Sequence, residues 1–173
     1  STPLYSSAAS DVYKRQVLVN DLKPDDSLIP QTKLVWTDKE EIYKQADVIS
    51  MHLPLTKHTK NMIRAEHIAL MKPDAILINT ARGGIINELD LANALNAGHL
   101  HGAAIDVFES EPYTGPLTDI ERCILTSHMG SMTVDCRTSM EIEATEEAVR
   151  FLRGLSLERE VSEEEYKFHN GVL

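Results

Sequence analysis

The sequence has few of the residues that mark several common protein classes. It contains two cysteines, Cys123 and Cys136, and no Cys-x-x-Cys pair, so neither a disulfide framework nor a metal site is expected. Scarce cysteine favours a reducing, cytoplasmic setting. No apolar run approaches the roughly 20 residues that span a bilayer. No basic stretch followed by an apolar segment opens the chain, so no secretory signal is expected.

Positive charge is also in short supply. The 173 residues carry 17 Lys and Arg against 27 Asp and Glu, for a formal net charge of −10. Nucleic acids and anionic membranes bind clustered Lys and Arg, so neither is expected as a partner. Aromatic residues make up 5% and hydrophobic residues 42% of the chain, an ordinary composition for one domain with one sizeable core.

The two ends of the chain differ in pattern from its middle. Residues 1–16 are Ser-rich and follow neither helical nor strand periodicity. We interpret them as a non-native lead, and the alternative is a natural disordered N-terminus. Residues 154–173 are acidic and weakly patterned, which predicts a tail. The remaining residues, 17–153, are predicted to form the folded domain.

Within that domain, short apolar runs alternate with helical patterns, which predicts an α/β fold with a mostly parallel sheet. Thr37, Asn87 and Thr133 are expected as helix N-caps. The last helix carries an apolar stripe of Met140, Ala144, Ala148, Phe151 and Leu152, and it ends before Gly154. Strands are predicted at 17–21, 33–36, 47–52, 75–79, 102–107 and 123–126, and helices at 38–45, 63–71, 87–97 and 134–153.

Parallel sheets bind ligands at the carboxyl ends of their strands, which directs attention to Asp21, His52, Asp106 and the turns after Asn79 and Thr126. We expect His52 either to have a structural role or to line a cofactor site. Asp21 and Asp106 can accept hydrogen bonds from a ligand, although a lone acid at a strand end is more often simply solvated.

Three side chains near those strand ends are candidates for chemistry. Arg82, followed by two glycines, can hold a carboxylate with its planar guanidinium, or it can be an ordinary surface arginine. His128 and Glu111 are the acid–base candidates, because a carboxylate beside an imidazole stabilises the imidazolium form. The sequence alone does not show whether these two residues touch.

Several motifs resemble, in the same order, those of the NAD-binding domain of the D-isomer-specific 2-hydroxyacid dehydrogenases, a family that includes D-3-phosphoglycerate dehydrogenases. The resemblance covers roughly residues 17–153. The matching segments are His52-Leu53-Pro54-Leu55-Thr56, Met71-Lys72-Pro73, Asn79-Thr80-Ala81-Arg82-Gly83-Gly84, the run from Gly102 to Pro112, and Thr126-Ser127-His128-Met129-Gly130-Ser131.

The resemblance implies an NAD-dependent interconversion of a D-2-hydroxyacid and a 2-oxoacid, of the phosphoglycerate or hydroxypyruvate type. It implies that Arg82 binds the substrate carboxylate, that His128 is the general acid–base, and that Glu111 orients it. For full-length members it implies a homodimer. The residues that it implies for cofactor binding are Asp21, Leu53, Thr80, Ala81, Arg82, Asp106, His128, Met129, Gly130 and Ser131, with Asp106 on the nicotinamide carboxamide and Asp21 on the ribose.

This sequence departs from the family pattern in two ways. Ser127 stands where the family usually has proline, and no Gly-x-Gly-x-x-Gly turn occurs in the chain. The resemblance therefore implies an incomplete Rossmann-type sheet: a C-terminal fragment without the first, central strand, which would lie between the strands at 17–21 and 47–52. We expect such a fragment to be inactive alone, poorly stable and weak in binding dinucleotide.

Two other interpretations remain open. A non-enzymatic, NAD(H)-sensing interaction module, similar to the transcriptional corepressors that resemble this family, can keep the same three catalytic-type residues. An unrelated α/β domain of the flavodoxin type explains the alternation of strands and helices but not the ordered motifs.

Overall fold

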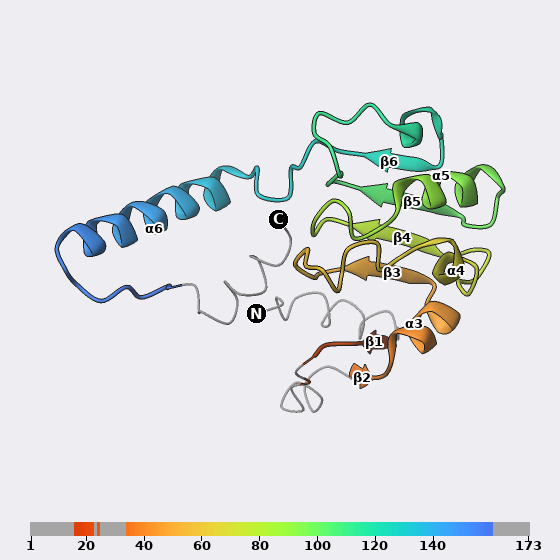
Figure 1. Cartoon of the computed structure of the whole chain (residues 1–173), viewed down its shortest axis with the longest axis horizontal. Coiled ribbons are helices and arrows are strands. Elements are labelled where there is room, and N and C mark those ends of the chain that lie inside the picture. Colours follow the sequence, from red (N-terminus) through yellow and green to blue (C-terminus); the bar gives the residue numbers. More distant parts are fainter. Residues whose placement is uncertain (1–15, 23, 25–33, 161–173) are drawn as a thin grey trace.

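The computed structural model describes residues 16–22, 24 and 34–160. Four strands form the main sheet in the order β3-β4-β5-β6, and each neighbouring pair is parallel. Their arrows point to the same side in Figure 1, so their carboxyl ends form one rim. This arrangement confirms the predicted parallel α/β fold. The strands are β3 Val48–Met51, β4 Ile76–Asn79, β5 Gly102–Ile105 and β6 Cys123–Leu125.

Two further strands, β1 (Val17–Val19) and β2 (Leu34–Trp36), form a separate parallel pair. In Figure 1 they lie beyond β3, and among the described residues no backbone pairing joins β1 to β3. Val48, at the start of β3, is 53% exposed. The interruption falls at the position where the resemblance implies an additional strand.

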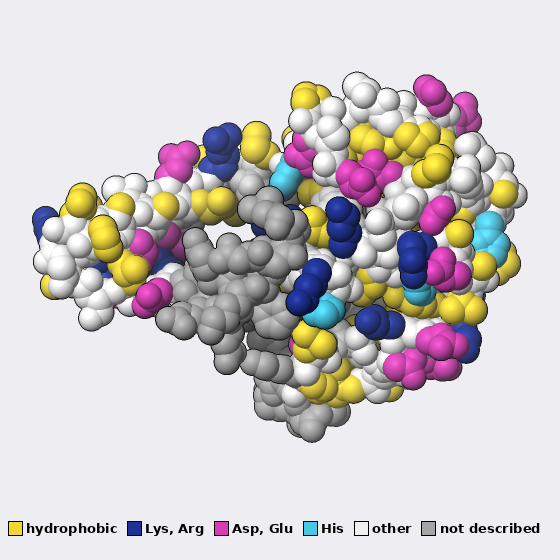
Figure 2. All heavy atoms as spheres, viewed as in Figure 1, with side chains coloured by type: hydrophobic (Ala, Val, Ile, Leu, Met, Phe, Trp, Pro, Cys, Tyr) yellow, Lys and Arg dark blue, Asp and Glu magenta, His cyan; other side chains and the backbone are white. Residues whose placement is uncertain are grey.

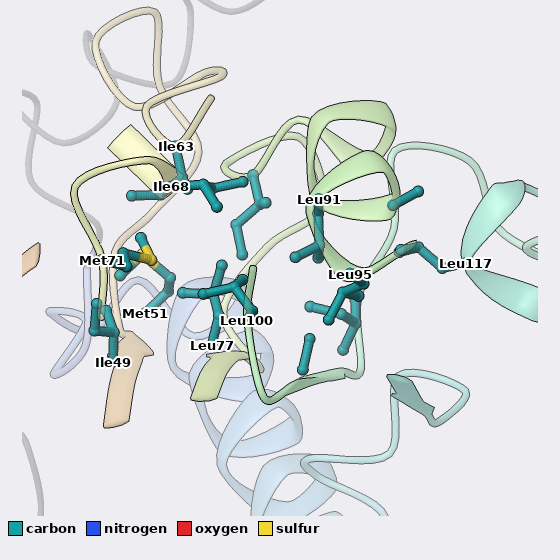
Figure 3. Close-up of a cluster of buried hydrophobic side chains, with 14 of the residues drawn as sticks. Ile49, Met51, Ile63, Ile68, Met71, Leu77, Leu91, Leu95, Leu100 and Leu117 are labelled. Carbon is teal, nitrogen blue, oxygen red and sulfur yellow. The ribbon is translucent and has the colours of Figure 1, made fainter. Parts of the chain in front are cut away.

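The core lies against one face of the main sheet (Figure 3). Leu91 and Leu95 of helix α5 (Glu88–Asn96) are fully buried, as is Leu77 of β4. Burial alternates along β4, whereas its apolar sequence predicts a strand that is covered on both faces. The opposite face is less covered, and Ile124 of β6 is 68% exposed.

Helix α3 spans Lys39–Gln45. It begins one residue later than the predicted helix at 38–45, for which Thr37 is the expected N-cap. The N-cap is Asp38, whose carboxylate accepts a hydrogen bond of 2.8 Å from the Glu41 N–H. Thr37 instead continues the β1–β2 pairing, because its N–H donates to the Val19 carbonyl at 3.0 Å, and the helix starts one residue further on. Lys33, predicted to open β2, lies outside the described residues.

The predicted helix at 63–71 is wrong at both ends, because α4 spans only Ala65–Ile68. Ile63 is extended and forms a parallel bridge with Ile86. At the other end, the Met71 N–H donates to the carbonyl of Ile68, three residues back, which closes a tight turn rather than another helical turn. The apolar pattern reflects burial of Ile63, Ile68 and Met71 in the core and not a continuous helix.

The caps of the two later helices are confirmed. Asn87 accepts a hydrogen bond of 2.9 Å from the Asp90 N–H at the start of α5. Thr133 accepts one of 3.3 Å from the Cys136 N–H at the start of α6 (Val134–Leu152), and Gly154 follows α6 with a φ of 67°. In these caps, side-chain oxygens bond N–H groups that have no partner within the helix.

Helix α6 projects from the body of the molecule (Figure 1), and none of its 19 residues is buried. Its apolar stripe is therefore open: Met140 is 54%, Phe151 71% and Leu152 82% exposed. Figure 2 shows hydrophobic side chains on the surface of the projecting arm. The sequence predicts the helix and its apolar face, and the structure adds that no described residue buries this face.

The start of the predicted acidic tail folds back on α6. Arg150 Nε donates to the carbonyl of Ser156 at 2.9 Å, and the Arg150 guanidinium pairs with Glu158 at 2.9 Å. The Glu158 N–H in turn donates to the Glu147 carboxylate at 3.1 Å. Among the described residues, no helix is long and apolar enough to cross a membrane.

Candidate functional site

The turn that carries Arg82 follows β4 and is shaped by Asn79, the last residue of that strand. Asn79 is 2% exposed. Its side-chain carbonyl accepts from the Ala81 N–H at 3.1 Å, and its amide donates to the Arg82 carbonyl at 2.9 Å. This local pairing is typical of asparagine in turns. It fixes the backbone that carries the exposed Arg82, whose guanidinium donates to the Ala81 carbonyl at 2.7 Å.

Gly83 lets this turn approach the segment after β5. A Cβ at Gly83 would lie 1.9 Å from the Phe108 carbonyl oxygen, so no other residue fits without moving the backbone. Gly84 has a φ of 76°, in the region that glycine enters without cost. The two glycines therefore bring Arg82 next to the segment that carries Glu111.

The two acid–base candidates are in contact. His128 Nδ1 lies 3.1 Å from Glu111 Oε2, and both side chains are partly exposed. The other carboxylate oxygen of Glu111 accepts from the Phe108 N–H, also at 3.1 Å. Residues 17 positions apart in the sequence thus meet at the rim, which the sequence alone does not reveal.

In the hydrogen bond between these two residues, His128 Nδ1 is the donor and the Glu111 carboxylate is the acceptor. The Phe108 N–H, and then the hydrogen bond from His128, hold the pKa of Glu111 below its usual range. Glu111 is therefore ionised at neutral pH, and an ionised carboxylate only accepts hydrogen bonds. Nδ1 must carry the proton, so Nε2 of His128 is left to exchange a proton with a ligand.

Asp106 follows β5 directly and is buried, with 5% exposure. Its Oδ1 accepts from the Thr126 hydroxyl at 2.5 Å and the Met129 N–H at 2.8 Å, and its Oδ2 accepts from the Gly130 N–H at 3.0 Å. Burial raises the pKa of Asp106, but these three hydrogen bonds and the nearby His128 outweigh it, so the net shift is downward. The carboxylate thus stays charged and holds the turn after β6.

The candidate residues surround one pocket at this rim, with a volume of about 450 Å³. Arg82, Glu111 and His128 all line it, so the structure brings the three together. Lys60 also lines it and adds a second permanent positive charge. The full lining is Leu55, Lys60, Arg82, Gly83, Gly84, Phe108, Glu109, Glu111 and His128.

The other residues implied for cofactor binding follow the carboxyl ends of several strands. Leu53 comes after β3, Thr80 and Ala81 after β4, and 129–131 after β6, so all lie along the rim of the main sheet. Asp21 lies two residues beyond β1, in the separate β1–β2 sheet, and is exposed. The structure therefore groups all of them except Asp21 with the main sheet.

Other reactive side chains have structural surroundings. Burial raises the pKa of the Cys123 thiol to about 11, which leaves it protonated and unreactive at neutral pH. His99 Nε2 lies 2.9 Å from the Ile68 carbonyl and links the segment after α5 to α4. His52 Nε2 lies 2.9 Å from the Ser50 hydroxyl and does not line the pocket.

Sequence reasoning missed Lys60, Asn79 and Thr126. Asn79 could have been found, because asparagine at a strand end before a glycine-containing turn is typical of side-chain-capped turns. Lys60 and Thr126 carry no comparable local signal. Their roles depend on contacts between loops that follow different strands.

Comparison with known proteins agrees with this geometry. The family model of the D-isomer specific 2-hydroxyacid dehydrogenase NAD binding domain matches residues 7–130. D-3-phosphoglycerate dehydrogenase of Bacillus subtilis is 44% identical over 117 residues, which are 67% of this chain and 22% of that protein. Glyoxylate reductase of Thermococcus litoralis is 41% identical over 120 residues, 69% of this chain and 36% of that protein.

A solved structure shares the fold. D-lactate dehydrogenase with NAD+ from Lactobacillus jensenii superposes with a TM-score of 0.78 at 28% identity, over 90% of this chain and 52% of that one. The chain thus spans about a quarter to a third of the two curated relatives and half of the solved one. The family match begins at residue 7, inside the segment interpreted as a lead, and that interpretation stays a prediction.

The matched segment contains the turn with Arg82, the segment with Glu111 and the turn with His128. The ordered motifs, the parallel sheet and the match over residues 7–130 agree with one another. The flavodoxin-type alternative is excluded, because the match spans the whole main sheet and its rim. This chain belongs to the D-isomer specific 2-hydroxyacid dehydrogenases, within their NAD binding domain.

Proposed function

We propose that this chain is the part of an NAD-dependent D-2-hydroxyacid dehydrogenase that carries its acid–base machinery. The reaction interconverts a 2-oxoacid and a D-2-hydroxyacid. The observation that carries the proposal is the contact of 3.1 Å between His128 Nδ1 and Glu111 Oε2, in the same pocket as Arg82. An oriented imidazole beside a carboxylate-binding guanidinium matches the needs of this reaction.

Each of the three side chains has a distinct part in the proposed mechanism. Arg82 binds the substrate carboxylate through its planar guanidinium, which places the adjacent carbonyl over the rim. His128 donates a proton from Nε2 to the carbonyl oxygen during reduction and accepts one from the hydroxyl during oxidation. Glu111 holds Nδ1 in its protonated form and stabilises the imidazolium.

The residues present fit the nicotinamide end of the cofactor. When bound, the cofactor would supply as NADH the hydride that carbon 2 gains in reduction, and would accept as NAD+ the hydride that carbon 2 loses in oxidation. Asp106 Oδ2 accepts one hydrogen bond and keeps a second acceptor position for the carboxamide. A Cβ at Gly130 would lie 3.5 Å from that oxygen, so a glycine there leaves room beside the carboxylate.

The backbone at Leu53, Thr80, Ala81 and Arg82, together with His128 and residues 129–131, would line the rest of the nicotinamide side. Asp21 would bind the adenosine ribose. No Gly-x-Gly-x-x-Gly turn occurs in the 173 residues, so we assign no residue to the pyrophosphate.

A finer proposal concerns the substrate and its setting. We propose a substrate of the phosphoglycerate or hydroxypyruvate type. Lys60 lines the pocket with Arg82, and a second cation there favours the phosphoglycerate type, whose substrate has a phosphate as well as a carboxylate. The low cysteine content supports a cytoplasmic setting, and the family resemblance supports a homodimer for the full-length protein.

The test is turnover by the full-length protein that carries these residues, with NADH and a panel of 2-oxoacids that have one or two anionic groups. His128→Ala should lower kcat by about 10²- to 10⁴-fold, the usual contribution of a general acid–base. Arg82→Lys should raise KM for the 2-oxoacid, because a lysine cannot form the two parallel hydrogen bonds that a guanidinium makes with a carboxylate.

The outcomes separate the candidate functions. Turnover that depends on His128 supports the dehydrogenase. Binding of NADH without turnover of any 2-oxoacid would reject it in favour of the NAD(H)-sensing interaction module. Equal turnover of substrates with one and two anionic groups would reject only the preference for the phosphoglycerate type, and failure to turn over both hydroxypyruvate and its phosphorylated form would reject the proposed substrate type.

A further inference from the structure

The turn that carries His128 is bonded at four of its groups to one buried residue, Asp106, which directly follows β5. The Asp106 carboxylate accepts hydrogen bonds from the Thr126 hydroxyl, which precedes His128, and from the backbone N–H groups of Met129 and Gly130, which follow it. The carbonyl of Asp106 also accepts a hydrogen bond from the N–H of His128 itself, at 2.8 Å. Asp106 thus bonds the turn on both sides of the histidine, in addition to the backbone bond from the Thr126 N–H to Ile105.

His128 itself has an unfavourable backbone conformation. Its φ is 53°, in the left-handed region that residues other than glycine rarely enter. Such a conformation persists only where surrounding contacts compensate for its cost. The four hydrogen bonds to Asp106 are contacts of that kind, and the bond from His128 Nδ1 to Glu111 is made from this backbone.

We propose that Asp106 and Thr126 are positioning residues, which fix the turn 126–130 so that His128 Nδ1 points at Glu111. The importance of this arrangement for catalysis rests on the proposed function, but the arrangement itself does not. Three of the four acceptor positions of the Asp106 carboxylate serve the chain, so Asp106 orders the turn even without cofactor. The Thr126 hydroxyl supplies the one of these three bonds that comes from a residue before the histidine, and the Met129 and Gly130 N–H groups supply the two from after it.

The test uses imidazole nitrogen spectra of the 173-residue chain at about pH 9, well above the usual titration range of histidine. The signal of His128 is identified by its loss in His128→Gln. The wild-type chain should show mainly the Nδ1–H tautomer. Thr126→Val removes only the hydroxyl and should shift the population towards Nε2–H. It should also speed amide exchange at Met129 and Gly130 by about tenfold or more.

Two variants control for other effects of the substitution. Thr126→Ser keeps the hydroxyl and should behave as wild type. Thr118→Val also removes one hydroxyl hydrogen bond, from Thr118 to the Gly115 carbonyl at 2.8 Å, but away from the turn. It should leave the His128 tautomer unchanged. The proposal is overturned if Thr126→Val has the same His128 tautomer population as wild type. It is also overturned if Thr126→Ser shows the tautomer population of Thr126→Val, or if Thr118→Val shifts that population as much as Thr126→Val does.

A measurement on the wild-type chain keeps the proposal testable if Thr126→Val does not fold. When Asp106 is protonated in acid, its hydrogen bonds from the turn weaken. The amide shifts of Met129 and Gly130 should therefore follow the carboxyl-carbon shift of Asp106 with one midpoint. The Glu111 carboxylate and the His128 imidazole also lie beside the turn, so amide shifts that follow the signals of either of those groups instead of Asp106 would overturn the proposal. None of these readouts requires turnover, so they are independent of the assay of the proposed function.

Discussion

Glu111 uses its two carboxylate oxygens for different partners. One accepts the Phe108 N–H, which ties it to its own loop, and the other accepts His128 Nδ1. Both bonds favour the ionised form, and the pKa of Glu111 is lowered accordingly, with the Phe108 N–H as the largest cause. The same bonds therefore orient the histidine and make the stability of the turn depend on pH.

Glu111→Gln should destabilise the chain at neutral pH and have no effect in acid. A carboxyl group with a lowered pKa contributes stability above its ordinary pKa of about 4.3, and this contribution is lost as the pH falls through the lowered value. Urea unfolding of wild type and variant at a series of pH values measures the difference. Glu109→Gln is the matched control, because the Glu109 carboxylate accepts no hydrogen bond from the described residues. A gap between wild type and Glu111→Gln that persists in strong acid would contradict the assignment.

Gly83→Ala should cost about 3 kcal/mol of unfolding free energy, because the new Cβ would overlap the Phe108 carbonyl oxygen. Gly98→Ala is the comparison: Gly98 has a φ of 73°, and an added Cβ would meet only Arg122 Nη2, at an ordinary contact distance of 3.6 Å, so only backbone strain of about 1 kcal/mol applies. Chemical unfolding measures both. Equal losses of unfolding free energy in the two variants would mean that the close approach of the two loops adds nothing to the cost of Gly83→Ala.

At the scale of single residues, the sequence identifies which side chains belong to the candidate site better than it identifies the hydrogen-bond partner of each. Arg82, Glu111 and His128 are identifiable because their motifs occur in family order. The bonds from Thr126 to Asp106 and from His128 to Glu111 are not, because they join segments that follow different strands and whose separation depends on the sheet. The predicted acceptor role of Asp106 is consistent with the structure, but three of its bonds come from its own chain and not from a ligand.

Helices α5 and α6 begin in the same way and differ in what they bury. Asn87 and Thr133 each accept one backbone N–H at the first turn. Helix α5 places Leu91 and Leu95 in the core, whereas α6 buries no residue. The same capping bond should therefore affect different properties of the chain.

Asn87→Ala should lower the global unfolding free energy by about 1 kcal/mol, the usual cost of losing an N-cap. Thr133→Ala should reduce the helical circular dichroism of α6 and leave the urea midpoint of the sheet unchanged. Far-ultraviolet dichroism reports the helix, and amide exchange of β4 and β5 reports the sheet. A fall in sheet stability in Thr133→Ala would show that α6 is coupled to the core.

The elements also show where sequence patterns are insufficient. All six predicted strands and the helices predicted at 38–45, 87–97 and 134–153 are found with shorter or nearly equal bounds, because their periodicity agrees with the elements that form. The helix at 63–71 fails because Ile63 pairs with Ile86, a contact between loops that no local pattern encodes. The apolar stripe of α6 is correctly located, but its exposure depends on what lies beside it.

At the scale of the whole molecule, the main feature is the division into two sheets. Strands β1 and β3 each pair on one side only among the described residues. Unpaired strand edges and exposed apolar residues such as Val48 lower the stability of a parallel sheet. The candidate acid–base residues lie in segments that follow strands of the four-stranded sheet, and not of the β1–β2 pair.

The 173-residue chain should unfold over a broad temperature range and bind NAD more weakly than about 1 mM. The reason is that β1–β2 has no described backbone bonds to the main sheet and that no glycine-rich turn is present for the pyrophosphate. Calorimetry measures both properties. Sharp cooperative unfolding together with tight, saturable NAD binding would contradict this expectation.

Helix α6 begins six residues after His128, and its 19 residues reach about 28 Å at 1.5 Å per residue. Because none of these residues is buried, the direction of the helix is set by the backbone of residues 131–133. A change of about 10° in that direction would move the far end of the helix by about 5 Å. A spectroscopic label at Leu152 would therefore report small changes in the backbone that links the histidine to the helix.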